Sequence, residues 1–135
     1  MDFELSEQLA RDTIEIIDLS LSKLLLMNDC RYPWVILVPR IAGAVEWHDL
    51  SAPNQQQLLS EVLQLAKLLS GFETVQKVNI GALGNVVPQL HVHVIGRQIG
   101  DEAWPKPVWG IGSAKPYQNP NSIITQIKIG LESRH

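Results

Sequence analysis

Residues 89–95 read QLHVHVI, a short run in which polar and apolar side chains alternate. Side chains two apart share one face of a β-strand, and neighbouring side chains point to opposite faces. One face therefore carries Gln89, His91 and His93. The other face is apolar and is expected to pack into the core, which leaves the polar row beside a cleft. The run predicts a strand that presents two imidazoles to a ligand.

The rest of the chain predicts four further strands and one long helix. Spacing and turn residues place these strands at residues 13–18, 22–27, 34–39 and 77–83, and the histidine strand at residues 90–95. The long helix covers residues 51–70, with Ser51 as its cap and apolar residues at three- and four-residue spacing. Shorter helices are predicted at residues 5–12 and from Asn121 onward. This order predicts an α+β fold with a mainly antiparallel five-stranded sheet, one long helix and a C-terminal helix.

Length and composition favour one domain with an ordinary core. The 135 residues are 45% hydrophobic and 19% charged, and the predicted domain has a core at about 13–98 and a C-terminal extension at 99–135. The net charge of -3 argues against a nucleic-acid polymer as partner. The N-terminus resembles no signal peptide, and the longest apolar run is too short to span a membrane. With Cys30 as the single cysteine, we expect a cytoplasmic protein.

The histidine pair has three readings. A neutral imidazole is a nucleophile, and a second histidine can donate a proton to the departing group, which suits transfer of a phosphoryl or nucleotidyl group. Alternatively, both side chains are solvated residues on the outer face of a strand. A metal site is the third reading, but Arg97 stands where an acidic ligand would be expected. We therefore predict no metal and no other cofactor.

The loop before the strand strengthens the first reading. Residues 79–85 combine Asn79 and Asn85 with two glycines, Gly81 and Gly84, which permit close approach of backbone to a ligand. An ordinary hairpin turn has the same composition. Because the loop leads directly into the histidine strand, a phosphate-binding role becomes the preferred interpretation.

These residues together resemble the histidine-triad (HIT) family of nucleotide hydrolases and transferases. The strand is similar to the family's His-x-His-x-His motif, with Gln-x-His-x-His in its place, and residues 34–40 resemble a family strand that ends in Pro-Lys or Pro-Arg. The order of elements agrees from about Leu21 to Gln98. Residues 104–110, WPKPVWG, look like those of a bacterial branch of the family.

The resemblance implies a mechanism and roles for particular residues. His91 would attack the α-phosphate of a dinucleoside polyphosphate or a phosphoramidate and form a nucleotidyl-histidine that water resolves. His93 would bind the phosphate or assist the leaving group. Phosphate contacts are expected from the loop residues Asn79, Gly84 and Asn85. The resemblance also implies a ribose contact from Asn28 or its neighbour Asp29, a homodimer whose sheet continues across the two-fold axis, and chemistry without a metal.

Two departures from the family pattern leave a second function open. Gln89 replaces the first histidine of the triad and can exchange hydrogen bonds but cannot carry a proton charge. Trp34 stands where many relatives have an accessory histidine, and it could stack on a base, line the pocket or fill core. A nucleotide-binding protein with weak or no catalysis is therefore the alternative to an enzyme.

Three other residues have simpler expectations. Trp104 and Trp109 are expected either to close the pocket or to pack the extension on the sheet. His48 is expected to lie at the surface or to cap a helix.

Overall fold

The computed structural model describes residues 2–132 and contains one five-stranded antiparallel sheet. Its order is β1-β2-β3-β5-β4, so the histidine-bearing strand lies between β3 and the edge strand β4. The strands are β1 (Thr13–Asp18), β2 (Ser22–Met27), β3 (Trp34–Pro39), β4 (Lys77–Gly81) and β5 (Val92–Arg97). The predicted fold class is confirmed.

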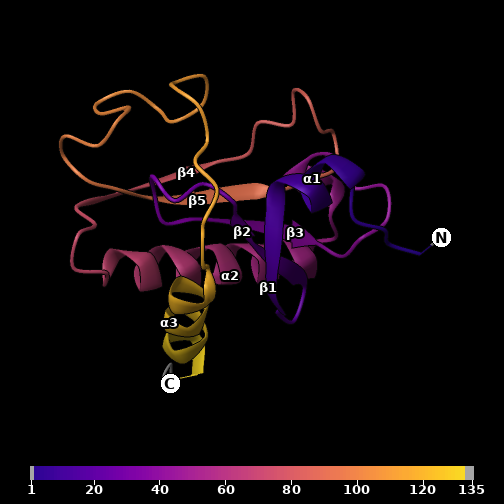
Figure 1. The fold of residues 1–135 in the computed structure, drawn as a ribbon. Coiled ribbons are helices and arrows are strands. Elements are labelled where there is room, and N and C mark those ends of the chain that lie inside the picture. Colours follow the sequence, from indigo (N-terminus) through magenta and orange to yellow (C-terminus); the bar gives the residue numbers. More distant parts are fainter. Residues whose placement is uncertain (1, 133–135) are drawn as a thin grey trace.

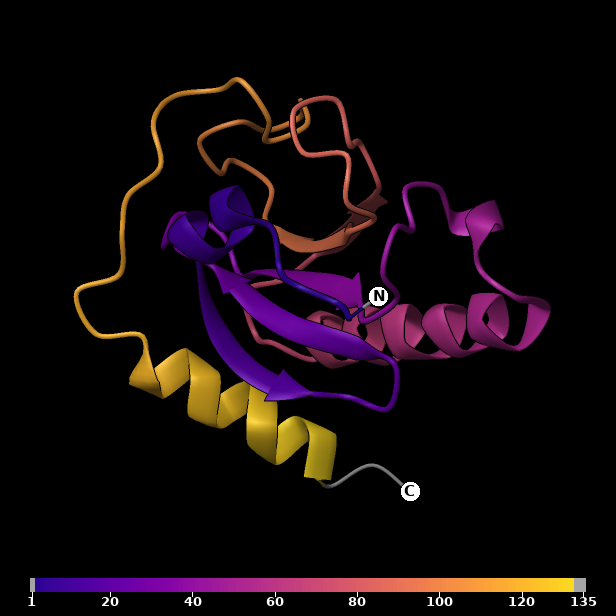
Figure 2. The same ribbon diagram turned by 90° about the vertical axis from the view of Figure 1, so that its right-hand side faces the viewer.

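The helices divide between the two faces of the sheet. They are α1 (Glu7–Asp12), the 3-10 helix η1 (Trp47–Asp49), α2 (Ala52–Ser70) and α3 (Asn121–Glu132). Figures 1 and 2 show α2 and α3 on one side of the sheet, with α1 and the loops of the extension on the other. Within residues 2–132, no helix is long and apolar enough to cross a membrane.

Two clusters of apolar side chains fill the space on either side of the sheet. Val92 and Val94 point toward α2 and join the larger cluster, which includes Val62 and Leu65 of that helix. Ile95 belongs to the second cluster, on the opposite face, with Trp34 and Leu9 of α1. All six residues of β3 and all six of β5 are buried, because both faces of these two strands are covered. The histidine side chains belong to the face that α1 covers.

Two strand boundaries differ from the sequence prediction at the loop that precedes the histidines. β4 ends at Gly81, two residues early, because the chain leaves the sheet for a loop in which Gly84 has a φ of 69°. β5 begins at Val92, two residues late. The Leu90 amide donates to the carbonyl of Ala44, at 3.0 Å, and this bond holds the residues before β5 in place of strand pairing.

Side chains rather than helices or strands hold the first part of the extension, residues 99–118, against the sheet. Arg97 bonds both carboxylate oxygens of Asp101, at 2.8 Å each. Arg31 pairs with Asp29 and Glu102, and also donates to the carbonyl of Ile111. These contacts place the extension over the same sheet face as the histidines.

Candidate active site

His91 and His93 lie side by side on the buried face that α1 and the extension cover. Only 7% of His91 and 5% of His93 is exposed. Their rings meet edge to face, with centroids 5.0 Å apart. Gly81 of β4 pairs with His93 across the sheet, so the residue directly opposite His93 has no side chain. The structure thus excludes the reading in which both histidines are solvated residues.

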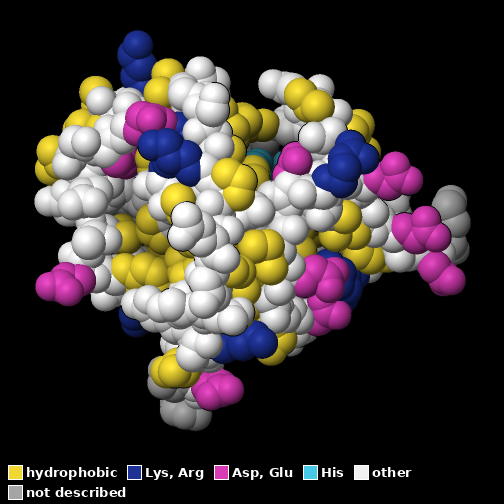
Figure 3. Space-filling model, viewed as in Figure 1, with side chains coloured by type: hydrophobic (Ala, Val, Ile, Leu, Met, Phe, Trp, Pro, Cys, Tyr) yellow, Lys and Arg dark blue, Asp and Glu magenta, His cyan; other side chains and the backbone are white. Residues whose placement is uncertain are grey.

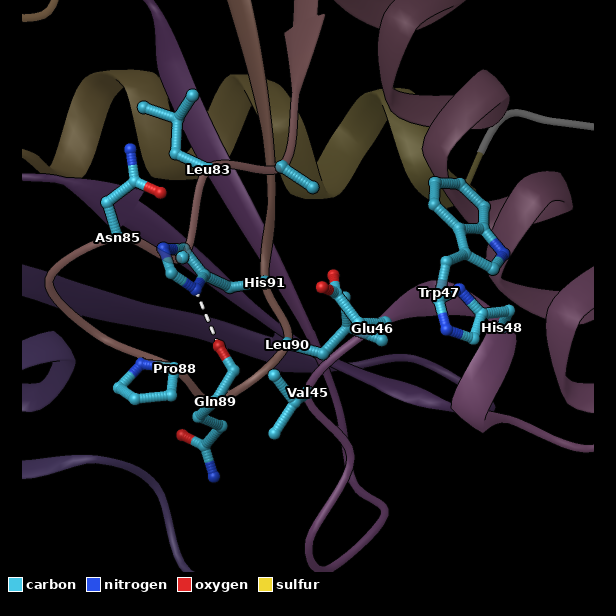
Figure 4. Close-up of a pocket in the computed structure, with 12 residues that line it drawn as sticks. Val45, Glu46, Trp47, His48, Leu83, Asn85, Pro88, Gln89, Leu90 and His91 are labelled. Atoms are coloured by element: carbon cyan, nitrogen blue, oxygen red, sulfur yellow. Dashed lines mark hydrogen bonds between the residues drawn. The ribbon is translucent and has the colours of Figure 1, made fainter.

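A backbone carbonyl fixes the orientation of the His91 ring. Nδ1 of His91 lies 2.7 Å from the carbonyl oxygen of Gln89, and Figure 4 shows this bond with the Gln89 side chain pointing away from the ring. A carbonyl oxygen can only accept, so Nδ1 carries the proton and donates it. Nε2 then bears the free electron pair that a nucleophile needs.

Trp34 fixes the opposite tautomer on His93. The indole Nε1–H of Trp34 donates to Nδ1 of His93 at 2.9 Å, which leaves the imidazole hydrogen on Nε2. Burial, together with a smaller electrostatic effect of the neighbouring His91, lowers the pKa of His93 to about 3. His93 is therefore a neutral hydrogen-bond donor at physiological pH, and Trp34 selects its tautomer.

This pKa predicts an acid-dependent loss of stability. The unfolded histidine has a pKa of about 6.5, so between pH 3 and 6.5 the unfolded chain binds a proton that the folded chain does not. The free energy of unfolding therefore falls as pH decreases through this range. From pH 7.5 to 4.5, we expect the wild type to lose about 2 to 3 kcal/mol more than His93→Gln. Urea unfolding of both proteins at the two pH values measures this difference, and equal losses would contradict the neutral assignment.

The two histidines form the floor of a cavity of about 340 Å³. Its other walls are mainly apolar and come from α1, β2, the loop before β5 and the extension. They comprise Gln8, Leu9, Asp12, Met27, Leu83, Gly84, Asn85, Val86, Val87 and Trp109. Figure 3 shows histidine atoms at the bottom of a hollow near the top of the molecule. An apolar cavity with a few polar groups at one end is a common form of small-molecule site.

Trp109 brings the extension directly to this site. Its ring packs edge to face on His93, with centroids 5.2 Å apart. Gly81 makes this approach possible, because a Cβ atom at that position would lie 3.2 Å from the Trp109 ring. Trp104 instead packs over the guanidinium of Arg97. Of the two tryptophans singled out in the extension, Trp109 lines the pocket.

A second cavity, of about 280 Å³, adjoins His91 on another side. It is lined by Val45, Glu46, Trp47, His48, Ala82, Leu83, Gly84, Asn85, Pro88, Gln89, Leu90 and His91. The two cavities share Leu83, Gly84, Asn85 and His91, so the loop before β5 separates them. Figure 4 shows Asn85 on the side to which the His91 ring points. Two of the residues predicted to contact phosphate, Gly84 and Asn85, therefore lie beside His91.

Three other predicted site residues use their side chains elsewhere. The carbonyl oxygen of the Asn79 side chain accepts from Arg97 at 2.9 Å, and that of Asn28 accepts from the Tyr117 amide at 2.9 Å. The Asp29 carboxylate is bound by Arg31. None of these three residues lines either cavity beside His91. Asn28 therefore holds the extension through Tyr117, and Asn79 binds Arg97 at the end of β5.

The sequence analysis did not identify the contributions of α1 and β2 to the pocket. Gln8, Leu9 and Asp12 reach it from α1, and Met27 reaches it from the end of β2. None of these residues belongs to a recognisable motif. Within residues 2–132, no group of three or more His, Cys, Asp or Glu side chains is arranged to hold a metal ion.

Comparison with known proteins identifies the family. The HIT domain model matches residues 9–100, and the chain therefore belongs to the HIT domain family. Proteins of this family are generally nucleotide-binding hydrolases or transferases. No curated protein sequence matches the chain.

Solved structures of histidine triad proteins are similar over almost the whole chain. One from Marinobacter aquaeolei VT8 is 43% identical, covers 98% of each chain and has a TM-score of 0.94. One from Sinorhizobium meliloti 1021 is 45% identical and covers 95% of this chain and 96% of its own, with a TM-score of 0.92. One from Bradyrhizobium japonicum is 42% identical and covers 96% and 98%, also with a TM-score of 0.92.

Proposed function

We propose that this chain is a nucleotide hydrolase or nucleotidyl transferase that acts at the α-phosphorus through His91. The observation that carries the proposal is the 2.7 Å bond from Nδ1 of His91 to the Gln89 carbonyl. It leaves an unprotonated Nε2 on a ring whose orientation is fixed, at the floor of a mainly apolar pocket. The proposed substrates are dinucleoside polyphosphates or nucleoside phosphoramidates.

The reaction proceeds in two displacements at phosphorus. In the first, the electron pair of Nε2 forms the P–N bond as the bond to the leaving group breaks, and an amine leaving group takes up a proton from solvent. In the second, water or another acceptor attacks phosphorus, releases its proton to solvent and returns the electron pair to Nε2 of His91. His93 is suited to only one of its two expected roles. Because it is neutral and carries its hydrogen on Nε2, it donates a hydrogen bond to a phosphate oxygen rather than a proton to the leaving group. The amides at Gly84 and Asn85 are the proposed further phosphate donors.

Trapping the covalent intermediate tests this proposal. The protein is mixed with adenosine 5′-phosphoramidate or diadenosine tetraphosphate, quenched in denaturant during turnover and examined by mass spectrometry. We expect an adenylyl adduct on the peptide that contains His91. The adduct should be absent in His91→Ala and present in His48→Ala, because His48 is an exposed residue of η1. Turnover without any adduct in the wild type would overturn the covalent mechanism.

Nucleotide binding with weak or no catalysis is the second candidate function. Two observations favour it. Gln89 cannot carry the charge of a histidine, and the hydrogen bond from the Trp34 indole to Nδ1 of His93 keeps that nitrogen from taking part in proton transfer. Calorimetry with adenosine monophosphate (AMP), combined with turnover assays on both substrate types, separates the two functions. Binding without turnover of either substrate would favour this candidate.

We also propose that the chain forms a homodimer through the β4 edge and α2. Leu59 and Leu63 lie one helical turn apart, and 48% and 51% of them is exposed. Ile80, which is 48% exposed, pairs with Val94 and so faces the side of the sheet that α2 covers. Beside them, β4 has a neighbouring strand on one side only. Exposed apolar side chains on α2 and β4, together with a free strand edge, are well suited to a second copy of the same surface.

Charge placed among these side chains should separate the subunits. Leu63→Glu is expected to convert the dimer into a monomer at micromolar concentration, because a carboxylate cannot be buried there without a partner. Size-exclusion chromatography with light scattering measures the mass. Ile17→Glu is the matched control, since Ile17 is similarly exposed but lies on β1, at the other edge of the sheet. A wild-type monomer, or a Leu63→Glu dimer, would contradict the proposed interface.

A cytoplasmic location completes the proposal. Cys30 is free and exposed, and a reducing compartment keeps such a thiol reduced. Nucleotide substrates are also available in that compartment.

A further inference from the structure

The side chain of Gln89 bonds the N-terminal segment rather than the other triad residues. Its Oε1 accepts from the Ser6 amide at 2.8 Å, and its Nε2 donates to the Glu4 carbonyl at 2.8 Å. Both ends of the amide are thus used by backbone more than eighty residues away in sequence. The main chain of the same residue orients His91. Gln89 therefore connects the nucleophile to residues 4–6.

Residues 4–6 lead directly into α1, which forms one wall of the nucleotide pocket. Ser6 precedes the helix, and its carbonyl accepts from the Ala10 amide at 2.9 Å. Gln8, Leu9 and Asp12 of this helix line the cavity above the histidines. Any movement of Ser6 would therefore be transmitted to the wall.

A helix of six residues needs tertiary contacts at both ends. Helices this short are not stable alone in water. The C-terminal end of α1 is held by the Asn28 amide, which donates to the Asp12 carbonyl at 3.0 Å. Thr13 Oγ1 donates to the Leu9 carbonyl at 2.6 Å. Leu9 itself is buried in the second core cluster. At the N-terminal end, the Gln89 amide supplies the corresponding side-chain bonds.

We propose that Gln89 is a positioning residue that holds α1 in place as a wall of the nucleotide pocket. This inference rests on the proposed function, because it assigns the first triad position to nucleotide affinity rather than to the chemistry at phosphorus. A glutamine amide suits this task because it offers a donor and an acceptor at every pH, whereas a carboxylate offers acceptors only.

Hydrogen exchange and calorimetry on Gln89→Ala test the two parts of the inference. In the free protein, exchange of the Ser6 amide should accelerate at least tenfold, because that amide donates directly to Gln89. The Kd for AMP should rise roughly tenfold, while kcat with saturating adenosine 5′-phosphoramidate stays within twofold. Gln89→Glu keeps the acceptor for Ser6 and loses the donor to Glu4, so its effects should be intermediate. Gln98→Ala, at an exposed position just beyond β5, should change neither quantity.

The outcomes separate this inference from the proposed function. Unchanged Ser6 exchange and unchanged AMP affinity in Gln89→Ala would overturn the positioning role. A fall in kcat of more than tenfold at constant AMP affinity would also overturn it, because Gln89 would then act in the chemistry. A wild type that neither binds AMP nor turns over substrate would overturn the nucleotide role of the wall together with the proposed function. Faster Ser6 exchange in the variant would still show that Gln89 holds the segment.

Discussion

Replacing His91 with alanine is expected to lower kcat by at least about a thousandfold, with the fold retained. Removal of a covalent nucleophile costs on the order of 10³ to 10⁶ in rate, because binding and the remaining phosphate contacts cannot replace the missing bond. The side chain is buried, and within residues 2–132 it makes a single hydrogen bond, to the Gln89 carbonyl. The expected loss of stability is about 1 to 3 kcal/mol. Steady-state kinetics and thermal unfolding measure the two effects.

The exposed residue His48 supplies the control for this experiment. It lines the second cavity but belongs to η1, not to the segment that carries His91 and leads into β5. His48→Ala should therefore retain kcat within about twofold. If His91→Ala kept a tenth of the wild-type kcat while remaining folded, the nucleophile would have to be another group.

Replacing Arg97 with methionine is expected to destabilise the protein by about 3 to 5 kcal/mol. The Arg97 side chain is only 2% exposed and makes three hydrogen bonds, two to Asp101 and one to Asn79. Without it, the Asp101 carboxylate, itself 9% exposed, loses its cation in a largely buried place. Removing one partner of a buried ion pair usually has a cost of this size, because the remaining charge is poorly solvated. Urea unfolding gives the difference directly.

Arg40→Met is the matched control for the Arg97 variant. Arg40 also pairs with an aspartate, Asp18, but the side chains are 30% and 52% exposed. Solvated pairs contribute little, so the expected change is below about 1 kcal/mol. Similar losses in the two variants would show that burial of the Arg97 pair has no special effect on stability.

Periodicity in the sequence was sufficient to predict the sheet and the long helix. Five strands, their antiparallel arrangement and the helix from residue 52 to residue 70 all follow from spacing of apolar side chains and from caps such as Ser51. The ends of β4 and β5 were predicted less well. The Leu90 amide pairs with Ala44, far away in sequence, and local alternation carries no information about such a contact.

The motif predicted the centre of the site but not its walls. His91, His93, Gly84 and Asn85 lie together as expected. The site contacts expected from Asn28 and Asn79 are not found at the pocket, because residues distant in sequence use their side-chain oxygens for packing.

The walls come from α1, which carries no motif, and from Trp109, for which closing the pocket was one of two expected roles. α1 reaches the pocket because Leu9 is buried against the sheet, and Trp109 reaches it because ion pairs such as Arg97–Asp101 fix the extension. These placements depend on tertiary contacts that the pattern of residues within each segment does not reveal.

The close packing of Trp109 against Gly81 couples two positions that are distant in the chain. A Cβ atom at position 81 would lie 3.2 Å from the indole ring, so the ring would have to shift by a few tenths of an ångström, and further for a larger side chain. A bulkier residue at position 81 would therefore require a smaller one at position 109, so the two sites should covary among related sequences. Gene libraries that randomise both positions together should yield functional large–small combinations in either order, whereas randomising position 81 alone should return mainly glycine.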